Sequence, residues 1–369
     1  MLTAIVSDLH LGTTVAGADV ARRPDVRARL LEALAGADQL VLLGDVLELR
    51  EQPLLAALEA ARPVLEGIGE LAAARRVVLV PGNHDHQLAG PWLARARLDA
   101  RGLGNENEWP VRPGDGVAAR LAEWMPDAEL VVAYPGVRLR PDVYVTHGHY
   151  LDVRLTVPRL ESLAASLMAR VTGRGRRCNS AEDYEAVLEP LYALLYTLAQ
   201  GSAPPAARSS GQLSRRVWRA LQADGAGRLP AFLLGRVTIP GAVAVLNRTG
   251  FGPFRPALSG AELRRAGVRA MAEVVEGMGV EADHVIFGHT HRPGPLPGDD
   301  PAEWALPSGG RLWNSGSWLY EGVFVDDDPH HPYWPGTVLY LEDSGPPRIE
   351  NLLRDVPLPG TPSAGASSR

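Results

Sequence analysis

The sequence contains no lysine, and all 37 basic residues among its 369 residues are arginines. Arginine stays protonated, so a lysine-type general base and a Schiff-base mechanism are both excluded. Cys178 is the only cysteine, which excludes an intramolecular disulfide and a zinc site built from thiolates. The sequence is also rich in alanine, glycine and proline. This composition, like the use of arginine in place of lysine, is typical of proteins from GC-rich genomes and does not indicate a function.

Long apolar runs are also missing. No stretch of about 18 apolar residues occurs, so a transmembrane helix is not expected. The chain begins with a short strand-like run and lacks the basic and long apolar segments of a secretory signal. The formal net charge of −6 disfavours a nucleic-acid-binding protein, which usually carries a basic surface. We therefore expect a cytoplasmic protein.

Short apolar runs bounded by glycine, aspartate or asparagine predict buried strands. The clearest runs cover residues 4–6, 40–43, 77–80, 143–146 and 285–287, and further strands are expected at 312–314, 322–325 and 337–341. Helical patterns lie between the first three strands, at residues 27–35 and 54–74, with a break near Pro63. This alternation predicts an α/β fold in which helices cover a sheet.

The middle of the chain has a different character. Apolar residues recur at helical spacing within residues 160–171, 191–198, 213–221 and 263–275. We therefore expect a mainly helical insertion at 151–280 that divides an α/β core into two parts, 1–150 and 281–356. Residues 357–369 are rich in proline, glycine and serine and are expected to be disordered.

Metal-capable side chains follow each of the five clearest strands. They are, in order, Asp8 and His10, then Asp45, then Asn83, His84 and Asp85, then His147 and His149, then His289 and His291. Ligand sites in open α/β sheets lie beyond the carboxyl ends of the strands, so these segments should converge. Each motif is weak alone, but five at strand ends form a strong combined signal. Glycines beside them would allow sharp turns and a close approach of the backbone.

The types of these side chains indicate which metal ions they could bind. Carboxylate, amide and imidazole ligands without thiolate suit Mn²⁺, Fe or Zn²⁺. Even seven of these side chains would be too many ligands for one ion, whereas a bridging carboxylate can join two ions in the arrangement used for in-line phosphoryl displacement. Such a pair would supply a hydroxide nucleophile at neutral pH and neutralise charge on the phosphoryl oxygens. The sequence thus predicts two divalent ions, with manganese favoured over iron and zinc.

The complete motif set resembles that of the calcineurin-like metallophosphoesterases. It consists of Asp8-x-His10, Gly44-Asp45-x-x-Glu48, Gly82-Asn83-His84-Asp85, His147-Gly148 and Gly288-His289-Thr290-His291. The resemblance covers residues 1–150 and 281–342 and implies a four-layer αββα sandwich with a dinuclear site. It implies that Asp45 bridges the two metals, the other ligands being Asp8, His10 and His291 for the first metal and Asn83, His147 and His289 for the second.

The resemblance also implies catalytic roles. His84 would contact the substrate phosphate and stabilise or protonate the leaving oxygen, and Asp85 would orient His84 from behind. Arg50, His149 and Arg292 are predicted to contact the substrate. Asn314-Ser315-Gly316-Ser317 is similar to an Asn-Pro-Gly-Ser turn of some members, and a structural role is expected for it.

Within this family the chain is most similar to the branch of UDP-2,3-diacylglucosamine hydrolases. The similarity lies in Asp8-Leu9-His10-Leu11, in Gly288-His289-Thr290-His291-Arg292-Pro293 and in a helical insertion after the fourth motif. The chain departs from that branch at His84, where those enzymes typically carry arginine. It departs again at His149, where they carry aspartate, and in its longer insertion. Cleavage of a lipid A precursor is therefore one candidate reaction.

The predicted function is hydrolysis of a phosphomonoester, phosphodiester or pyrophosphate bond by a metal-bridging hydroxide. A helical cap and an acidic balance favour a small or lipid-linked substrate over long nucleic acid. The alternatives are a metal-dependent nuclease and, from a different class, a non-catalytic interaction scaffold, which the complete ligand set disfavours. The sequence leaves the oligomeric state and any peripheral membrane contact open.

Overall fold

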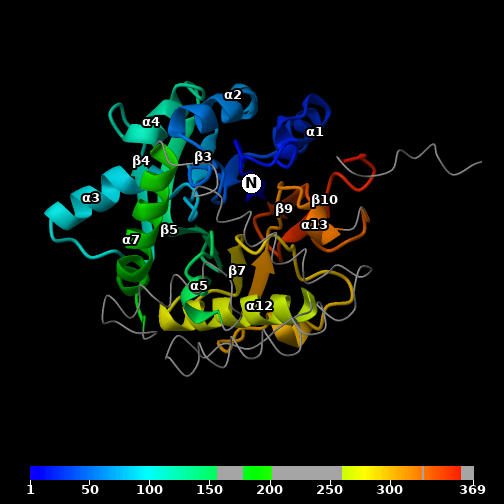
Figure 1. Cartoon of the computed structure of the whole chain (residues 1–369). Coiled ribbons are helices and arrows are strands. Elements are labelled where there is room, and N and C mark those ends of the chain that lie inside the picture. Colours follow the sequence, from blue (N-terminus) through cyan, green and yellow to red (C-terminus); the bar gives the residue numbers. More distant parts are fainter. Residues whose placement is uncertain (156–177, 202–259, 326–327, 359–369) are drawn as a thin grey trace, which may run out of the picture. The chain divides into compact units, whose positions relative to one another are not determined.

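The computed structural model describes residues 1–155, 178–201, 260–325 and 328–358 (Figure 1). The chain divides into two compact units, residues 1–149 with 280–369, and residues 150–279. The first unit contains the whole sheet and the helices that accompany it, so the predicted α/β class is confirmed.

Ten strands form one sheet within the part of the chain that the structure describes. Their order is β10-β9-β1-β2-β3-β5-β6-β7-β8, with β4 paired to β5. Their bounds are β1 Thr3–Val6, β2 Gln39–Leu42, β3 Arg76–Leu79, β4 Glu106–Pro110, β5 Glu129–Arg140, β6 Val143–Thr146, β7 His284–Phe287, β8 Arg311–Asn314, β9 Thr337–Leu341 and β10 Arg348–Asn351. All five of the clearest predicted strands are present, and so are those expected at 312–314 and 337–341.

The sheet contains two parallel groups joined by one long strand. Strands β1, β2, β3 and the first part of β5 pair in parallel, as do β6, β7 and β8. The second part of β5 pairs antiparallel with β6. Strand β5 therefore changes partner along its length, and it connects the two groups.

One face of the sheet encloses a shared apolar core. The core includes Ile5 of β1, Val78 of β3, Val145 of β6 and Ile286 of β7, together with Leu339 of β9, and all five are fully buried. A flat sheet could not bring residues from both groups into one cluster, so the sheet must curl over this core. The curled sheet supplies the two β layers of the expected sandwich.

Helices accompany the first strands. The helices of this unit are η1 Val20–Arg22, α1 Pro24–Ala35, α2 Leu54–Leu71, η2 His86–Leu88, α3 Gly90–Leu98, α4 Gly116–Ala122, η4 Pro301–Trp304 and α13 Gly322–Val325. The predicted break near Pro63 is wrong, because α2 continues through this residue. Pro63 lies on the exposed side, where water can satisfy the carbonyl that loses its partner. The strand predicted at 322–325 is also wrong, because four apolar residues do not distinguish a strand from a helix.

The second unit is helical where it is described. It contains α5 Leu151–Arg154, α7 Ala181–Gln200 and α12 Gly260–Gly277. Helix α7 begins at the N-cap Ser180, whose side chain accepts a hydrogen bond from the Asp183 amide. The helices predicted at 191–198 and 263–275 are confirmed, whereas those predicted at 160–171 and 213–221 lie outside the described residues, as does the tail from residue 359. No helix among the described residues is long and apolar enough to cross a membrane.

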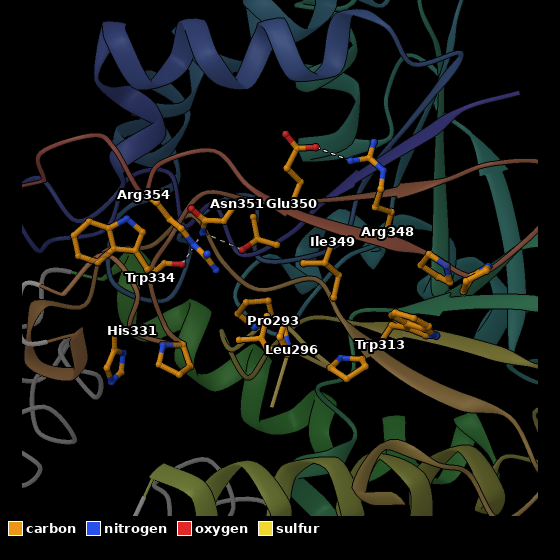
Figure 2. Close-up of a pocket in the computed structure, with 16 residues that line it drawn as sticks. Pro293, Leu296, Trp313, His331, Trp334, Arg348, Ile349, Glu350, Asn351 and Arg354 are labelled. Carbon is orange, nitrogen blue, oxygen red and sulfur yellow. Dashed lines mark hydrogen bonds and ion pairs between the residues drawn. The ribbon is translucent and has the colours of Figure 1, made fainter. Parts of the chain in front are cut away.

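A groove of about 670 Å³ lies beside the two edge strands, β8 and β10 (Figure 2). Trp313, Trp334 and Ile349 contribute to its lining, with several prolines from the segments that follow His291 and precede β10. None of the predicted metal ligands lines this groove.

Candidate metal centre

The predicted ligands come together in the first unit. We call Asp8, His10 and His291 the first cluster, and Asp45, Asn83, His147 and His289 the second cluster. In each cluster the histidine and carboxylate ligand atoms are close enough to hold one metal ion. Segments that follow β1, β2, β3, β6 and β7 supply these side chains, so the strand ends converge as predicted.

The first cluster is compact, with Asp8 and His10 buried and His291 partly buried. Nε2 of His10 lies 3.2 Å from Nε2 of His291. Oδ1 of Asp8 lies 3.3 Å from Nε2 of His291, and it has no hydrogen-bond donor among the described residues. The other oxygen of Asp8, Oδ2, accepts a hydrogen bond of 3.2 Å from the amide of His289. Oδ1 is thus the oxygen left to face the cluster.

The second cluster is arranged around Asp45. Oδ2 of Asp45 lies 3.2 Å from Nε2 of His147 and 3.7 Å from Nε2 of His10. One atom of the Asn83 amide group lies 3.1 Å from Nδ1 of His289 and 3.2 Å from Oδ2 of Asp45. The same oxygen of Asp45 is therefore close to both clusters.

Hydrogen bonds define how the histidine rings face the clusters. Nδ1 of His10 donates to Glu48 at 3.0 Å, and Nδ1 of His291 donates to Glu321 at 3.0 Å. Nδ1 of His147 donates to the carbonyl of Leu43 at 2.9 Å. Because Nδ1 of each ring carries its proton toward an acceptor, Nε2 faces the cluster, as in histidines that bind metals.

The backbone around these residues is strained. Among the described residues, seven other than glycine have positive φ, and five of them are predicted ligands: Asp8, His10, Asp45, His289 and His291. Each such residue costs about 1–2 kcal/mol, a strain that persists mainly at functional sites. The predicted role of the neighbouring glycines also holds. A Cβ on Gly44 would collide with the His147 ring, and one on Gly288 would lie 2.6 Å from Oδ2 of Asp8.

Buried charges explain the pKa shifts. Burial raises the pKa of Asp8 and Asp45, but the neighbouring histidines outweigh it, so both pKa values fall below their ordinary range. Burial lowers the pKa of His147 and His291, but nearby carboxylates raise them to about 9 and about 10. Protons on the imidazoles balance the buried carboxylates.

These residues fit divalent cations. Ligands that share an ion with bonds of about 2.0–2.2 Å lie roughly 3–3.5 Å apart, and most separations in both clusters fall in this range. The oxygen of Asp8 without a donor and the inward-facing imidazole nitrogens are electron-pair donors. A cation would replace the imidazole protons as the balancing charge.

His84 lies beside the clusters. Its backbone amide donates to Oδ1 of Asp45 at 2.8 Å, and its Nδ1 lies 2.8 and 2.7 Å from the two oxygens of Glu48. Burial lowers the pKa of His84, but the carboxylates of Glu48 and Asp45 raise it above its ordinary value. The His84 side chain remains 21% exposed, unlike that of His10 at 4%. Solvent therefore reaches His84 more easily than His10.

The predicted role of Asp85 is corrected. Its carboxylate is not hydrogen-bonded to His84; it accepts hydrogen bonds from the backbone amides of Gly82, Asp45, Val46 and Leu47. Asp85 therefore holds the turn after β2 against the turn after β3. Glu48 orients His84 instead, although it appeared in the sequence motif only as a companion of Asp45.

Two residues predicted to contact the substrate, Arg292 and His149, are bound to other side chains, and their contact with the substrate stays a prediction. Arg292 is buried and forms a bidentate ion pair with Asp299, at 2.6 and 2.7 Å, which fixes its own loop. His149 is only 1% exposed, and its Nε2 is hydrogen-bonded to the hydroxyl of Tyr134 at 3.1 Å. Burial holds the pKa of His149 well below its ordinary value, so it is neutral.

Arg50 is placed differently from these two residues. Nη1 of Arg50 lies 2.6 Å from the second atom of the Asn83 amide group, and Nε has no hydrogen-bond partner among the described residues. Its charge acts to lower the pKa of His84, against the larger effect of the carboxylates of Glu48 and Asp45. Contact between Arg50 and the substrate therefore stays a prediction.

The fold is thus a curled α/β sheet, and the carboxylates and imidazoles clustered at its strand ends could hold metal ions. Residues 1–183 match the family model for calcineurin-like phosphoesterases. This part of the chain belongs to that superfamily, and the match indicates a metal-dependent phosphoric ester hydrolase. The matched region ends before His289 and His291, which follow the second unit in the sequence and complete the clusters. No curated protein matches the chain.

Proposed function

We propose that the chain hydrolyses a phosphate ester at a dinuclear centre. In this proposal Asp8, His10 and His291 hold one ion, Asn83, His147 and His289 hold the other, and Asp45 bridges them. The observation that carries it is the position of Oδ2 of Asp45, 3.7 Å from Nε2 of His10 and 3.2 Å from Nε2 of His147. A single oxygen in this position can serve both ions.

The metal chemistry follows from the ligand types. Bound divalent ions would lower the pKa of water and neutralise charge on the phosphoryl group. Manganese is the ion we favour, with iron and zinc as alternatives, because oxygen and imidazole ligands occur together without thiolate.

The protein supplies the acid and a phosphate contact. His84 would donate a proton to the leaving oxygen, since Glu48 holds its Nδ1 and favours its charged form. Arg50 would bind the phosphate. When Asn83 turns its oxygen toward the second cluster, its NH₂ group faces Nη1 of Arg50, and the repulsion between these donors releases the guanidinium for an anion.

The role of His84 as a general acid favours some types of phosphate bond over others. An alkoxide is strongly basic and leaves poorly without a proton, whereas a phosphate group leaves from a pyrophosphate without one. A histidine held as an acid therefore supports a phosphomonoester or phosphodiester over a pyrophosphate. A lipid-linked nucleotide-sugar pyrophosphate, as in the UDP-2,3-diacylglucosamine hydrolase branch, stays a second candidate because of the shared Asp8-Leu9-His10-Leu11 motif.

The test uses the purified full-length chain. We would measure bound metals and compare Mn²⁺-dependent hydrolysis of an alkyl phosphomonoester, an alkyl phosphodiester, a nucleotide-sugar pyrophosphate and single-stranded DNA. We expect metal-dependent cleavage of an alkyl ester. Cleavage of DNA alone would favour a nuclease, and bound metals without any hydrolysis would favour the interaction scaffold.

A further inference from the structure

Residues 314–321, which we call the 314–321 loop, run from the last residue of β8 to the start of α13 and contact the first cluster at several points. The amide of Trp318 and Oγ of Ser317 both donate to the backbone carbonyl of Asp8, at 3.0 and 3.2 Å. Asp8 has a φ of 54°. Because this conformation is strained, two hydrogen bonds to its carbonyl help to keep Asp8 in place.

The same loop holds the segment that carries His291. Nδ2 of Asn314 donates to the carbonyl of Gly288 at 2.8 Å and to Oγ1 of Thr290 at 3.0 Å. Glu321, at the other end of the loop, accepts the hydrogen bond from Nδ1 of His291 at 3.0 Å. The loop thus ties together two strand ends that are distant in the sequence.

We propose that Glu321 is a positioning residue for the first cluster. By holding Nδ1–H of His291, it directs Nε2 of that ring toward Asp8 and His10 and increases the affinity of the first cluster for its ion. This inference rests on the proposed function, because it requires His291 to be a metal ligand. It also gives the 314–321 loop a more specific role than the structural one expected from its sequence.

The two clusters differ in how their histidines are supported. In the first, His10 and His291 each donate to a carboxylate, from Glu48 and Glu321. In the second, His147 donates to a main-chain carbonyl, which no side-chain substitution removes. A carboxylate partner makes the imidazole a stronger electron-pair donor, and losing such a partner typically weakens metal binding about 10–100-fold.

The experiment compares Mn²⁺ binding to the metal-free full-length wild type and to E321A, E321Q, H291A and E342Q, by calorimetry. Glu342 is exposed and directly follows β9, so E342Q makes the same chemical change as E321Q at a residue outside both clusters. We expect the wild type to bind two equivalents of Mn²⁺. In E321A the affinity for one equivalent should fall about 10–100-fold, and the affinity for the other should not change. E321Q should fall between E321A and the wild type, because its amide oxygen still accepts the hydrogen bond.

Visible spectra of the Co²⁺-loaded chains test the role of Glu321 at the metal directly. If Glu321 only stabilised the loop, its replacement would leave the spectrum of bound Co²⁺ unchanged. E321A should change the ligand-field bands of one of two bound Co²⁺ ions, and E342Q should change neither. If E321A binds both Mn²⁺ equivalents with wild-type affinity while H291A loses one, the role of Glu321 is overturned but the ligand assignment stands. Two equivalents retained in H291A would overturn this role and the proposed ligand assignment together.

Discussion

Oε2 of Glu48 lies 2.7 Å from Nδ1 of His84 and also accepts a hydrogen bond from Nδ1 of His10 at 3.0 Å. One buried carboxylate therefore orients both the proposed acid and a proposed ligand of the first cluster. The charge of Glu48 also opposes the effect of burial on the pKa of His84. Loss of this carboxylate should affect catalysis and metal binding in separable ways.

Replacing His84 with alanine should lower kcat while both metals remain bound. General acids typically contribute about 10²–10⁴-fold to the rate, so we expect a loss of this size with an alkyl phosphate. With a nitrophenyl ester the loss should be much smaller, because nitrophenolate leaves without a proton. Rates on both esters and metal analysis check this. Equal losses on the two esters would exclude His84 as the acid, and loss of metal would make it a ligand.

Replacing Glu48 with glutamine should change the pH profile. The Glu48 carboxylate raises the pKa of His84, so a neutral amide lets this pKa fall. The acid then loses its proton at a lower pH, and the alkaline limb of the kcat profile moves toward lower pH. The profile should be measured at saturating Mn²⁺, because Glu48 also supports His10. An alkaline limb at the wild-type position would show that Glu48 does not control the acid.

Replacing Arg50 with alanine should weaken phosphate binding. A hydrogen bond to a charged group contributes about 1.5–3 kcal/mol, so kcat/KM should fall about 10–150-fold. Competitive inhibition by inorganic phosphate should weaken in parallel, while Mn²⁺ stoichiometry stays at the wild-type value. R62A provides the control, because Arg62 pairs with Glu66 on the exposed side of α2. Unchanged inhibition by phosphate in R50A would remove Arg50 from the proposed site.

Much of the fold could be predicted because strands that are buried on both faces have apolar sequences. The strands that escaped prediction are different. Strands β4 and β10 alternate exposed and half-buried residues, so they lack that signal. Strand β5 contains Pro135 and Gly136, which usually mark a turn. In the structure Gly136 begins the part of β5 that pairs with β6, so these residues lie where the strand changes partner.

The site could be predicted where each residue belongs to a strand-end motif. Residues that act through another side chain carry no such mark. Glu321 lies 30 residues after its partner His291, and nothing in the sequence relates the two. Similarly, the position of Arg292 next to His291 does not reveal its ion pair with Asp299. Contacts made across loops depend on the folded backbone, which local patterns do not specify.

Metal removal should make stability depend on pH. Without metal, the carboxylates of the clusters raise the pKa of His147 to about 9 and that of His291 to about 10, above the unfolded value of about 6.5. A raised histidine pKa contributes stability that is fully present below pH 6.5 and is lost as pH rises through 9 to 10. The lowered pKa values of Asp8 and Asp45 make stability depend on pH only near pH 4 and below, which is outside the range from pH 6.5 to 10. Bound metal replaces the imidazole protons and removes this dependence.

The measurement is the Tm of the chain between pH 6.5 and 10, with Mn²⁺ and after treatment with a chelator. We expect the Tm of the metal-free chain to fall faster with pH, so that the difference between the two forms grows toward pH 10. At each shifted histidine the effect is greatest once the pH exceeds the folded pKa, because the buried carboxylates then lack a balancing charge. Parallel curves over the whole range would show that His147 and His291 do not carry the protons that the metals displace.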